Sequence, residues 1–272
     1  MSTHSRLSLD RPPFRLDTDR LDQYLTISPA VITDLLRAAA LQPGDTVLEI
    51  GAGTGLITRA IAARAGATIA TELDRRFEPY LQRLHRRNGV SVHWADFRFS
   101  APERVTAVVA NPPFGVTEHL VDWLTQLPHL RRVALIVGQR FARAATAPPG
   151  STQYTRLSLH LQAAFTSQLC GSIPPTNFYP PTRACAAILT LQPAAASPLL
   201  HALDAAVATT AGIRLHKLLY DLHGRDLLRG SLPALQDRLR PHLHRRIQQL
   251  TNAELSLTAH ALLAANDEEI SK

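Results

Sequence analysis

The segment A-N-P-P-F-G, residues 110–115, follows an apolar run and combines an amide, two prolines and an aromatic ring. The N6 amino group of adenine is a poor nucleophile because its lone pair is delocalised into the ring, so methyl transfer to it needs hydrogen-bond acceptors. We predict that the side-chain oxygen of Asn111 and the backbone oxygen of Pro112 are these acceptors, in a loop stiffened by proline. Phe114 is predicted to stack on a base that has left its helix. The alternative interpretation is an ordinary turn after a buried strand.

A second segment, E-I-G-A-G-T-G over 49–55, lies between a predicted strand and a predicted helix. Gly51 and Gly53 let the backbone pass close to a ligand. The segment lacks the G-x-G-x-x-G spacing and no G-K-[ST] follows, so a pyrophosphate site is not indicated. Glu72 and Asp96 end the next two predicted strands, where they are suited to bind ribose hydroxyls and an exocyclic amine. Together these residues predict an adenosine pocket, and S-adenosyl-L-methionine is the obvious adenosine ligand without phosphates.

These residues need a scaffold, and the apolar pattern predicts one. Strands are expected at 46–50, near 67–74, near 90–96, at 105–110 and near 132–138, with helices between them. The alternation predicts an α/β fold with a doubly wound parallel sheet. The predicted domains are a basic N-terminal arm (1–22), a catalytic domain (23–193) and a small helical C-terminal domain (194–272).

The composition limits which kinds of partner the protein is expected to bind. The net charge of +7 favours a polyanionic partner. The chain shows neither a secretory leader nor a run of about 18 apolar residues, so we expect a soluble cytoplasmic protein without a membrane partner. Its two cysteines have no metal-site spacing, and no metal is expected. The charge alone does not choose between DNA, RNA and another anionic surface. Arginines expected to contact phosphates of such a partner lie in the arm (Arg6, Arg11, Arg15, Arg20) and on a predicted tail helix (Arg238, Arg240, Arg245, Arg246).

The chain resembles the rRNA adenine N6-methyltransferases, which comprise KsgA-type dimethylases and erythromycin-resistance (Erm) methylases. The resemblance runs from about residue 24 to 265 and rests on V-L-E-I-G-A-G-T-G-L-I-T, T-E-L-D, A-D-F, N-P-P-F, Q-Y-T-R-L-S-L and F-Y-P-P-T-R. It implies a Rossmann-like class I methyltransferase fold, S-adenosyl-L-methionine as cofactor, rRNA as partner and a monomer. The residues implied around the donor are Gln23, Leu25, Gly51, Gly53, Glu72, Asp96 and Asn111. The resemblance also implies that Phe178 is a second aromatic wall for the target adenine, although from the sequence Phe178 is equally plausible as a core residue.

Two departures from the family pattern bear on the substrate. Pro112 stands where the family usually has an aliphatic residue, and Gln23 stands where it has Asn or His. The arginine-rich arm and this divergence favour the Erm side, which implies 23S rRNA as the target and macrolide, lincosamide and streptogramin B resistance. The alternatives are a KsgA-type 16S rRNA dimethyltransferase, a DNA adenine N6-methyltransferase, a protein-glutamine methyltransferase and a non-catalytic rRNA-binding assembly factor.

Overall fold

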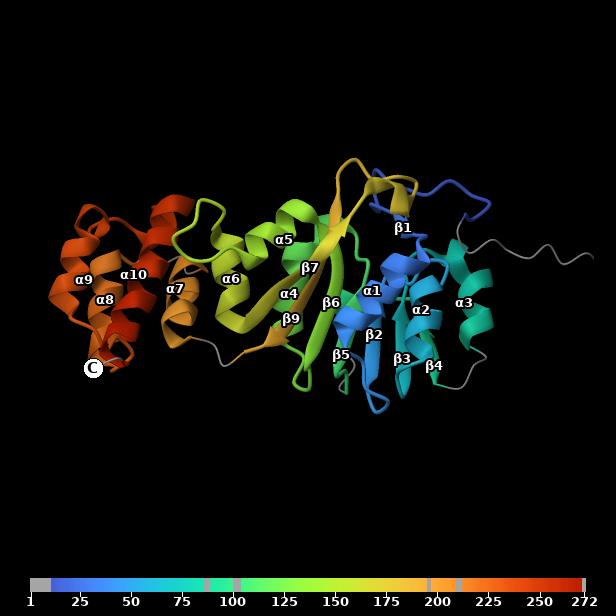
Figure 1. The fold of residues 1–272 in the computed structure, drawn as a ribbon, viewed down its shortest axis with the longest axis horizontal. Coiled ribbons are helices and arrows are strands. Elements are labelled where there is room, and N and C mark those ends of the chain that lie inside the picture. The colour runs from blue at the N-terminus through green and yellow to red at the C-terminus, as the bar shows by residue number, and fades with distance from the viewer. Residues whose placement is uncertain (1–10, 86–88, 100–103, 195–196, 209–211, 271–272) are drawn as a thin grey trace, which may run out of the picture. The chain divides into compact units, whose positions relative to one another are not determined.

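The computed structural model describes residues 11–85, 89–99, 104–194, 197–208 and 212–270 (Figure 1). The chain divides after residues 142, 167 and 193 into two compact units. The sheet unit contains the chain up to 142 together with 168–193, and the helical unit contains 143–167 together with the chain from 194 onward.

The main sheet has seven strands in the order β4-β3-β2-β5-β6-β9-β7. The first five, from β4 to β6, are parallel, and β9 pairs with β6 in the antiparallel sense. This arrangement confirms the predicted doubly wound, Rossmann-like sheet. The sequence also predicts strands near 166–173 and 184–191, and the structure has them, but the antiparallel pairing of β9 with β6 was not predicted. The strands are β2 (Thr46–Ile50), β3 (Ala67–Thr71), β4 (Val90–His93), β5 (Ala107–Ala110), β6 (Arg132–Gly138), β7 (Phe165–Ile173) and β9 (Ala186–Pro193).

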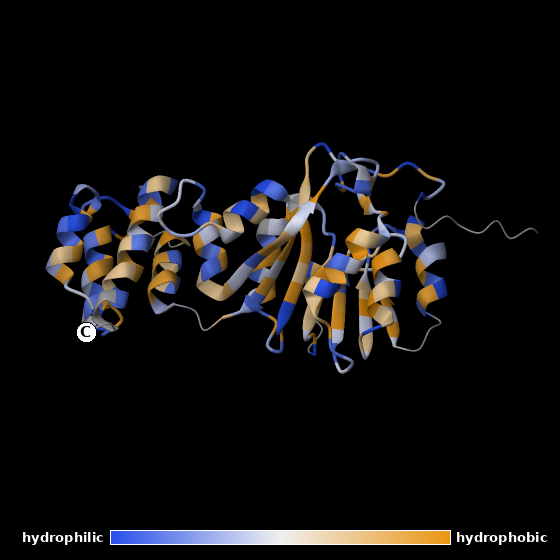
Figure 2. Ribbon diagram, in the orientation of Figure 1, coloured by the Kyte–Doolittle hydropathy of each residue, from blue (hydrophilic) through white to orange (hydrophobic). Residues whose placement is uncertain are grey.

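Burial of apolar strands holds the sheet unit together, and Figure 2 shows hydrophobic residues along its central strands. Helix α1 (Pro29–Ala39) begins at the N-cap Ser28, whose side chain accepts a hydrogen bond from the Val31 amide. Its apolar side chains and those of α2 (Leu56–Ala62) pack in one cluster with Val47 and Val109 of the central strands. The remaining helices of this unit are α3 (Glu78–His85) and α4 (Thr117–Thr125), and α5 (Gln139–Thr146) spans the boundary between the units.

A two-stranded sheet ties the N-terminal part of the sheet unit to a distant segment. Strand β1 (Leu25–Thr26) pairs with β8 (Phe178–Tyr179) in the antiparallel sense. Residues 11–22 belong to the predicted basic arm, and in the structure this part of the arm packs on the sheet unit. Phe14 meets Phe77 edge to face with ring centroids 5.2 Å apart, and Leu16 is buried in the same cluster. Arg6 of the predicted arm lies outside the described residues.

The helical unit is built from α6 (Arg156–Ala164), α7 (Pro198–Ala208), α8 (Leu215–Gly224), α9 (Leu232–Arg238) and α10 (Asn252–Ile270). Residues 143–167 belong to it, whereas the sequence placed the boundary at 193/194, because Tyr154 and Leu159 are buried with leucines of α7 and α8. The basic segment expected as one helix is instead the end of α9 followed by two 3-10 turns, Arg240–His242 and Ile247–Gln249. None of the described helices is long and apolar enough to cross a membrane.

Candidate active site

A pocket lies at the carboxyl ends of β2, β3 and β5 and beside the loop after β4. Strands β2 and β5 are neighbours in the sheet, and the chain proceeds from them in opposite directions, through β3 to β4 and through β6 to β9. Ligands of open α/β sheets bind at such a switch point. Glu72, Asp96 and Asn111 all line the pocket, so the fold brings together the three polar side chains that the sequence singled out.

The glycine turn forms one side of this pocket. Gly51, Gly53 and Gly55 have φ values of +73°, +52° and +80°, a region that residues with a Cβ rarely adopt. A Cβ on Gly53 would also lie 2.7 Å from Cδ2 of Leu25, which lines the pocket as expected. The Gly51 and Ala52 amides donate to the Thr71 oxygen at 2.9 and 3.0 Å and fix the turn against β3. The turn therefore requires glycine at these positions, and its backbone forms part of the pocket wall.

Glu72 is almost fully buried and accepts three backbone hydrogen bonds. Its Oε2 accepts from the Gly53 amide at 2.8 Å, and its Oε1 accepts from the Leu73 and Asp74 amides at 2.8 and 2.9 Å. Burial raises the pKa of this carboxyl above its usual range, although the three amides oppose the shift. A carboxylate has about four acceptor positions, so Glu72 as placed here has one left. To accept hydrogen bonds from both hydroxyls of a ribose, Glu72 would have to give up one of its three hydrogen bonds to backbone amides.

Asp96 forms a close ion pair with Arg98, which also lines the pocket. The Arg98 Nε lies 3.0 Å from each carboxylate oxygen, and its Nη2 lies 2.5 Å from Oδ2. These hydrogen bonds hold the pKa of Asp96 below its usual range, so this side chain is an acceptor at neutral pH.

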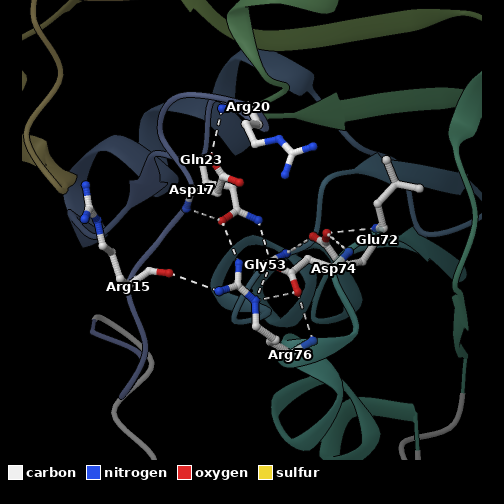
Figure 3. Close-up of polar contacts among 9 residues, drawn as sticks. Arg15, Asp17, Arg20, Gln23, Gly53, Glu72, Asp74 and Arg76 are labelled. Atoms are coloured by element: carbon white, nitrogen blue, oxygen red, sulfur yellow. Dashed lines mark hydrogen bonds and ion pairs between the residues drawn. The ribbon is translucent and has the colours of Figure 1, made fainter.

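The N-terminal segment is fastened beside the pocket by a polar network (Figure 3). Gln23 donates from Nε2 to Asp74 Oδ2 at 2.8 Å and accepts from the Asp17 amide at 2.8 Å. Asp74 also binds Arg76, whose Nη1 donates to the Arg15 carbonyl at 3.1 Å. Gln23, predicted as a donor contact, thus lines the pocket and is held in place by side chains that sequence reasoning missed. The only available signal was the run of charges after T-E-L-D.

Asn111 is oriented by a backbone group of the same segment. Its Nδ2 donates to the Tyr24 carbonyl at 2.7 Å, so its side-chain oxygen remains an acceptor. The loop that follows is tied to the same region, because the Gly115 amide donates to Asp22 Oδ2 at 3.2 Å. Pro113 lines the pocket, whereas Pro112 is buried and is not among its lining residues. The Phe114 side chain lies outside the part of the chain that the structure describes.

Phe178, which the family resemblance implied as a second aromatic wall for the target adenine, is a core residue in this structure. Its side chain is 1% exposed and packs in the cluster that contains Ile173 and Ile188, so no base can stack on it here. Pairing of Thr26 with Phe178 in the β1–β8 sheet turns the ring into the core. The neighbouring Tyr179 is half-buried, and the Arg11 guanidinium lies 5.4 Å from its ring centroid.

The charges around the pocket suit a cation. Four carboxyl side chains and one guanidinium line it: Asp22, Glu49, Glu72, Asp96 and Arg98. The guanidinium is already bound to Asp96, so the pocket wall offers no unpaired cation to a phosphate, and it suits a sulfonium donor better than a phosphate-bearing adenosine ligand. Among the described residues no group of three or more His, Cys, Asp or Glu side chains could hold a metal ion.

Comparison with known proteins identifies a matching family and two similar relatives. The profile of the family described as ribosomal RNA adenine dimethylase matches residues 17–205. A relative in Prochlorococcus marinus (strain MIT 9313), named ribosomal RNA small subunit methyltransferase A, is 31% identical over 252 residues, which are 86% of this chain and 90% of the relative. A relative in Methanopyrus kandleri, named probable ribosomal RNA small subunit methyltransferase A, is 34% identical over 64% of this chain and 63% of its own length, so this match spans less than two thirds of that relative.

Among solved structures, the crystal structure of the 23S rRNA methyltransferase ErmE is similar with a TM-score of 0.63 and 23% identity, and the similarity covers 86% of this chain and 98% of that one. At this identity the likeness concerns the fold alone.

Proposed function

The chain belongs to the ribosomal RNA adenine dimethylase family, and we propose that it methylates N6 of adenine in the RNA of the small ribosomal subunit. It is an rRNA adenine N6-methyltransferase that uses S-adenosyl-L-methionine. The small-subunit assignment is supported by two relatives that carry that name. The 23S preference and the antibiotic resistance expected from the sequence find no support in these relatives, and the likeness to ErmE carries no argument about the substrate.

The arrangement of Asn111 carries the proposed chemistry. S-adenosyl-L-methionine supplies an electrophilic methyl group on a positively charged sulfur when it is bound. The Tyr24 carbonyl holds the Asn111 amide nitrogen, which leaves the side-chain oxygen to accept a hydrogen bond from the adenine amino group. The side-chain oxygen of Asn111 is held in this orientation before the substrate arrives, so little reorganisation is needed during the reaction.

The donor site is assigned to the walls of the same pocket. Glu72 and Asp96 present carboxylates to the adenosine part, and the glycine turn permits close approach of the backbone. Gln23 and Leu25 line the pocket from the N-terminal side. Phe114 is retained in the proposal as the residue that stacks on the target base, while Phe178 is a core residue in this conformation.

The proposed RNA contacts are exposed arginines. Arg238, Arg240 and Arg246 are exposed in the helical unit, whereas Arg245 is bound to Glu254 and to the Gln249 carbonyl and is less available. Each phosphate contact releases counterions, so removal of a contacting arginine flattens the salt dependence of RNA binding. We expect Arg240→Gln to reduce the slope of log affinity against log salt by about 0.7 to 0.9, and an unchanged slope would remove Arg240 from the interface. Arg245→Gln is the matched control.

The proposal is tested by primer extension on rRNA from a host that lacks its own small-subunit adenine dimethylase. Dimethylation removes both N6 hydrogens, so reverse transcriptase stops at the modified base. We expect stops in 16S rRNA when the wild-type chain is expressed and none with Asn111→Ala. A stop in 23S rRNA with unchanged 16S rRNA would replace the proposal with the large-subunit alternative.

A further inference from the structure

Glu49 is a carboxyl side chain in the pocket wall that the mechanism above does not use. It belongs to β2, immediately before the glycine turn, and is 1% exposed. Its Oε2 is buried and has no hydrogen-bond partner within the described residues, yet the side chain lines the pocket. A buried carboxylate oxygen without a partner is costly, so this group needs either a proton or a cation.

The neighbours of Glu49 supply no cation. On β3, the Thr71 hydroxyl donates to the backbone oxygen of Glu49 at 3.0 Å, and on β5 the paired residue is Val109. Helix α2 contributes Thr58, whose hydroxyl and backbone amide favour the ionised form of Glu49 by hydrogen bonding but bring no positive charge. The other ionisable side chains that line the pocket are Asp22, Tyr24, Glu72, Asp96 and Arg98. The single cation among them, Arg98, is already paired with Asp96.

The charge state of Glu49 in the free protein follows from this setting. Burial, reinforced by the negative charge of Glu72, raises the pKa of Glu49 to about 8, although Thr58 opposes the shift. Below that pH the free protein therefore holds a neutral carboxyl group beside the donor site. A fixed positive charge in the pocket would favour the ionised form by direct attraction across a poorly hydrated space.

We propose that Glu49 releases its proton to solvent when the methyl donor binds, and that the resulting carboxylate favours the sulfonium donor over the demethylated product. The O–H bond of Glu49 breaks, the proton goes to the buffer, and the carboxylate faces the donor's positive charge. The product carries no charge on sulfur, so it shifts the equilibrium less and leaves more easily. The inference rests on the family's methyl donor and is independent of which RNA is methylated.

Linkage fixes the direction of the pH effect. Because the donor prefers ionised Glu49, donor affinity rises with pH up to about 8 and levels off above it. If the donor lowers the pKa of Glu49 by one to one and a half units, donor affinity should increase roughly five- to tenfold between pH 6.5 and 8.5. Product affinity should change by less. The donor's own α-ammonium titrates near the same range, so the contribution of Glu49 is the difference between the wild type and Glu49→Gln.

The experiment is isothermal titration calorimetry of the full chain with S-adenosyl-L-methionine and with S-adenosylhomocysteine at pH 7. Repeating each titration in buffers of different ionisation enthalpy counts the protons released without relying on turnover. For a pKa lowered by one to one and a half units, we expect the wild type to release about 0.4 to 0.7 proton more with the donor at this pH than Glu49→Gln does, and this difference to be much smaller with the product. Circular dichroism and the thermal midpoint establish that each variant is folded.

Glu72→Gln separates the two neighbouring carboxyls, whose titrations are coupled. Proton release that persists in Glu49→Gln and disappears in Glu72→Gln would overturn the assignment to Glu49. Equal release by the wild type and Glu49→Gln, or equal release with donor and product, would also overturn it. If Glu49→Gln does not fold, Glu49→Asp replaces it, with a shift in the pH at which donor affinity levels off as the expected result. Donor binding by the wild type without RNA methylation would leave this inference standing and refute the proposed function.

Discussion

Replacement of Asn111 tests the reaction centre most directly. In Asn111→Ala the side-chain oxygen that we assign to the target amino group is lost, and the Tyr24 carbonyl loses the amide that binds it at 2.7 Å. In Asn111→Asp an oxygen is retained, but no N–H remains for the Tyr24 carbonyl and a negative charge is added. The two variants therefore separate the role of the acceptor from the role of its orientation.

The magnitudes follow from what each variant removes. Loss of one preorganised hydrogen bond to the reacting group typically reduces turnover about 10²- to 10³-fold, and we expect this for Asn111→Ala. Asn111→Asp loses the orienting hydrogen bond, whose net value of about 0.5–1.5 kcal/mol corresponds to at most about a tenfold decrease. Loss of the hydrogen bond to the Tyr24 carbonyl lowers the free energy of unfolding by about 0.5–1.5 kcal/mol in both variants. Donor affinity should change less than turnover, because the other walls of the pocket remain.

The assay is single-turnover transfer of labelled methyl groups to small ribosomal subunits that lack adenine dimethylation, at saturating enzyme. Donor affinity is measured separately by calorimetry on the same preparations. Wild-type single-turnover rates in Asn111→Ala would refute the assignment of the acceptor. Equal losses in both variants, with intact donor binding, would mean that orientation by Tyr24 matters as much as the oxygen itself.

Three further perturbations test the surroundings of the site. Gly53→Ala places a Cβ at a φ of +52° and 2.7 Å from Leu25, and we expect about tenfold weaker donor binding by calorimetry; unchanged binding would show that the turn adapts. Arg76→Gln removes the guanidinium that joins Asp74 to the Arg15 carbonyl, and we expect faster amide hydrogen exchange over 14–23 with little change in the thermal midpoint of the whole chain. Equal exchange in variant and wild type would mean that apolar packing alone holds this segment.

The third perturbation is Glu49→Gln, and the quantity compared with the wild type is the stability of the ligand-free protein as a function of pH. The pKa of Glu49 is raised from 4.5 to about 8 in the folded chain, so the stability contributed by its protonated form is complete below 4.5 and is lost as the pH rises through 8. The wild type should therefore lose stability relative to the variant by up to about 1.4 kcal/mol per pH unit across this interval. Parallel pH profiles of the two thermal midpoints would contradict the buried, protonated state.

Much of the proposed donor site follows from local sequence patterns. Alternation of apolar strands with helices places Glu72, Asp96 and Asn111 at neighbouring carboxyl ends, because parallel strands joined by crossovers all end at one edge of the sheet. The glycine turn is equally local, since its positive φ values suit residues without a Cβ. These features depend on residues within one strand and the turn that follows it, and the sequence alone determined them.

Tertiary structure decided the contacts that join distant segments. The Gln23–Asp74 bond links residues 51 positions apart, and the Asn111 amide meets the Tyr24 carbonyl across 87 positions. Phe178 lies in the core because β8 pairs with β1, a pairing that the composition of neither short strand predicts. Such contacts depend on which surfaces meet once the sheet has formed, and local propensity and periodicity carry no information about that choice.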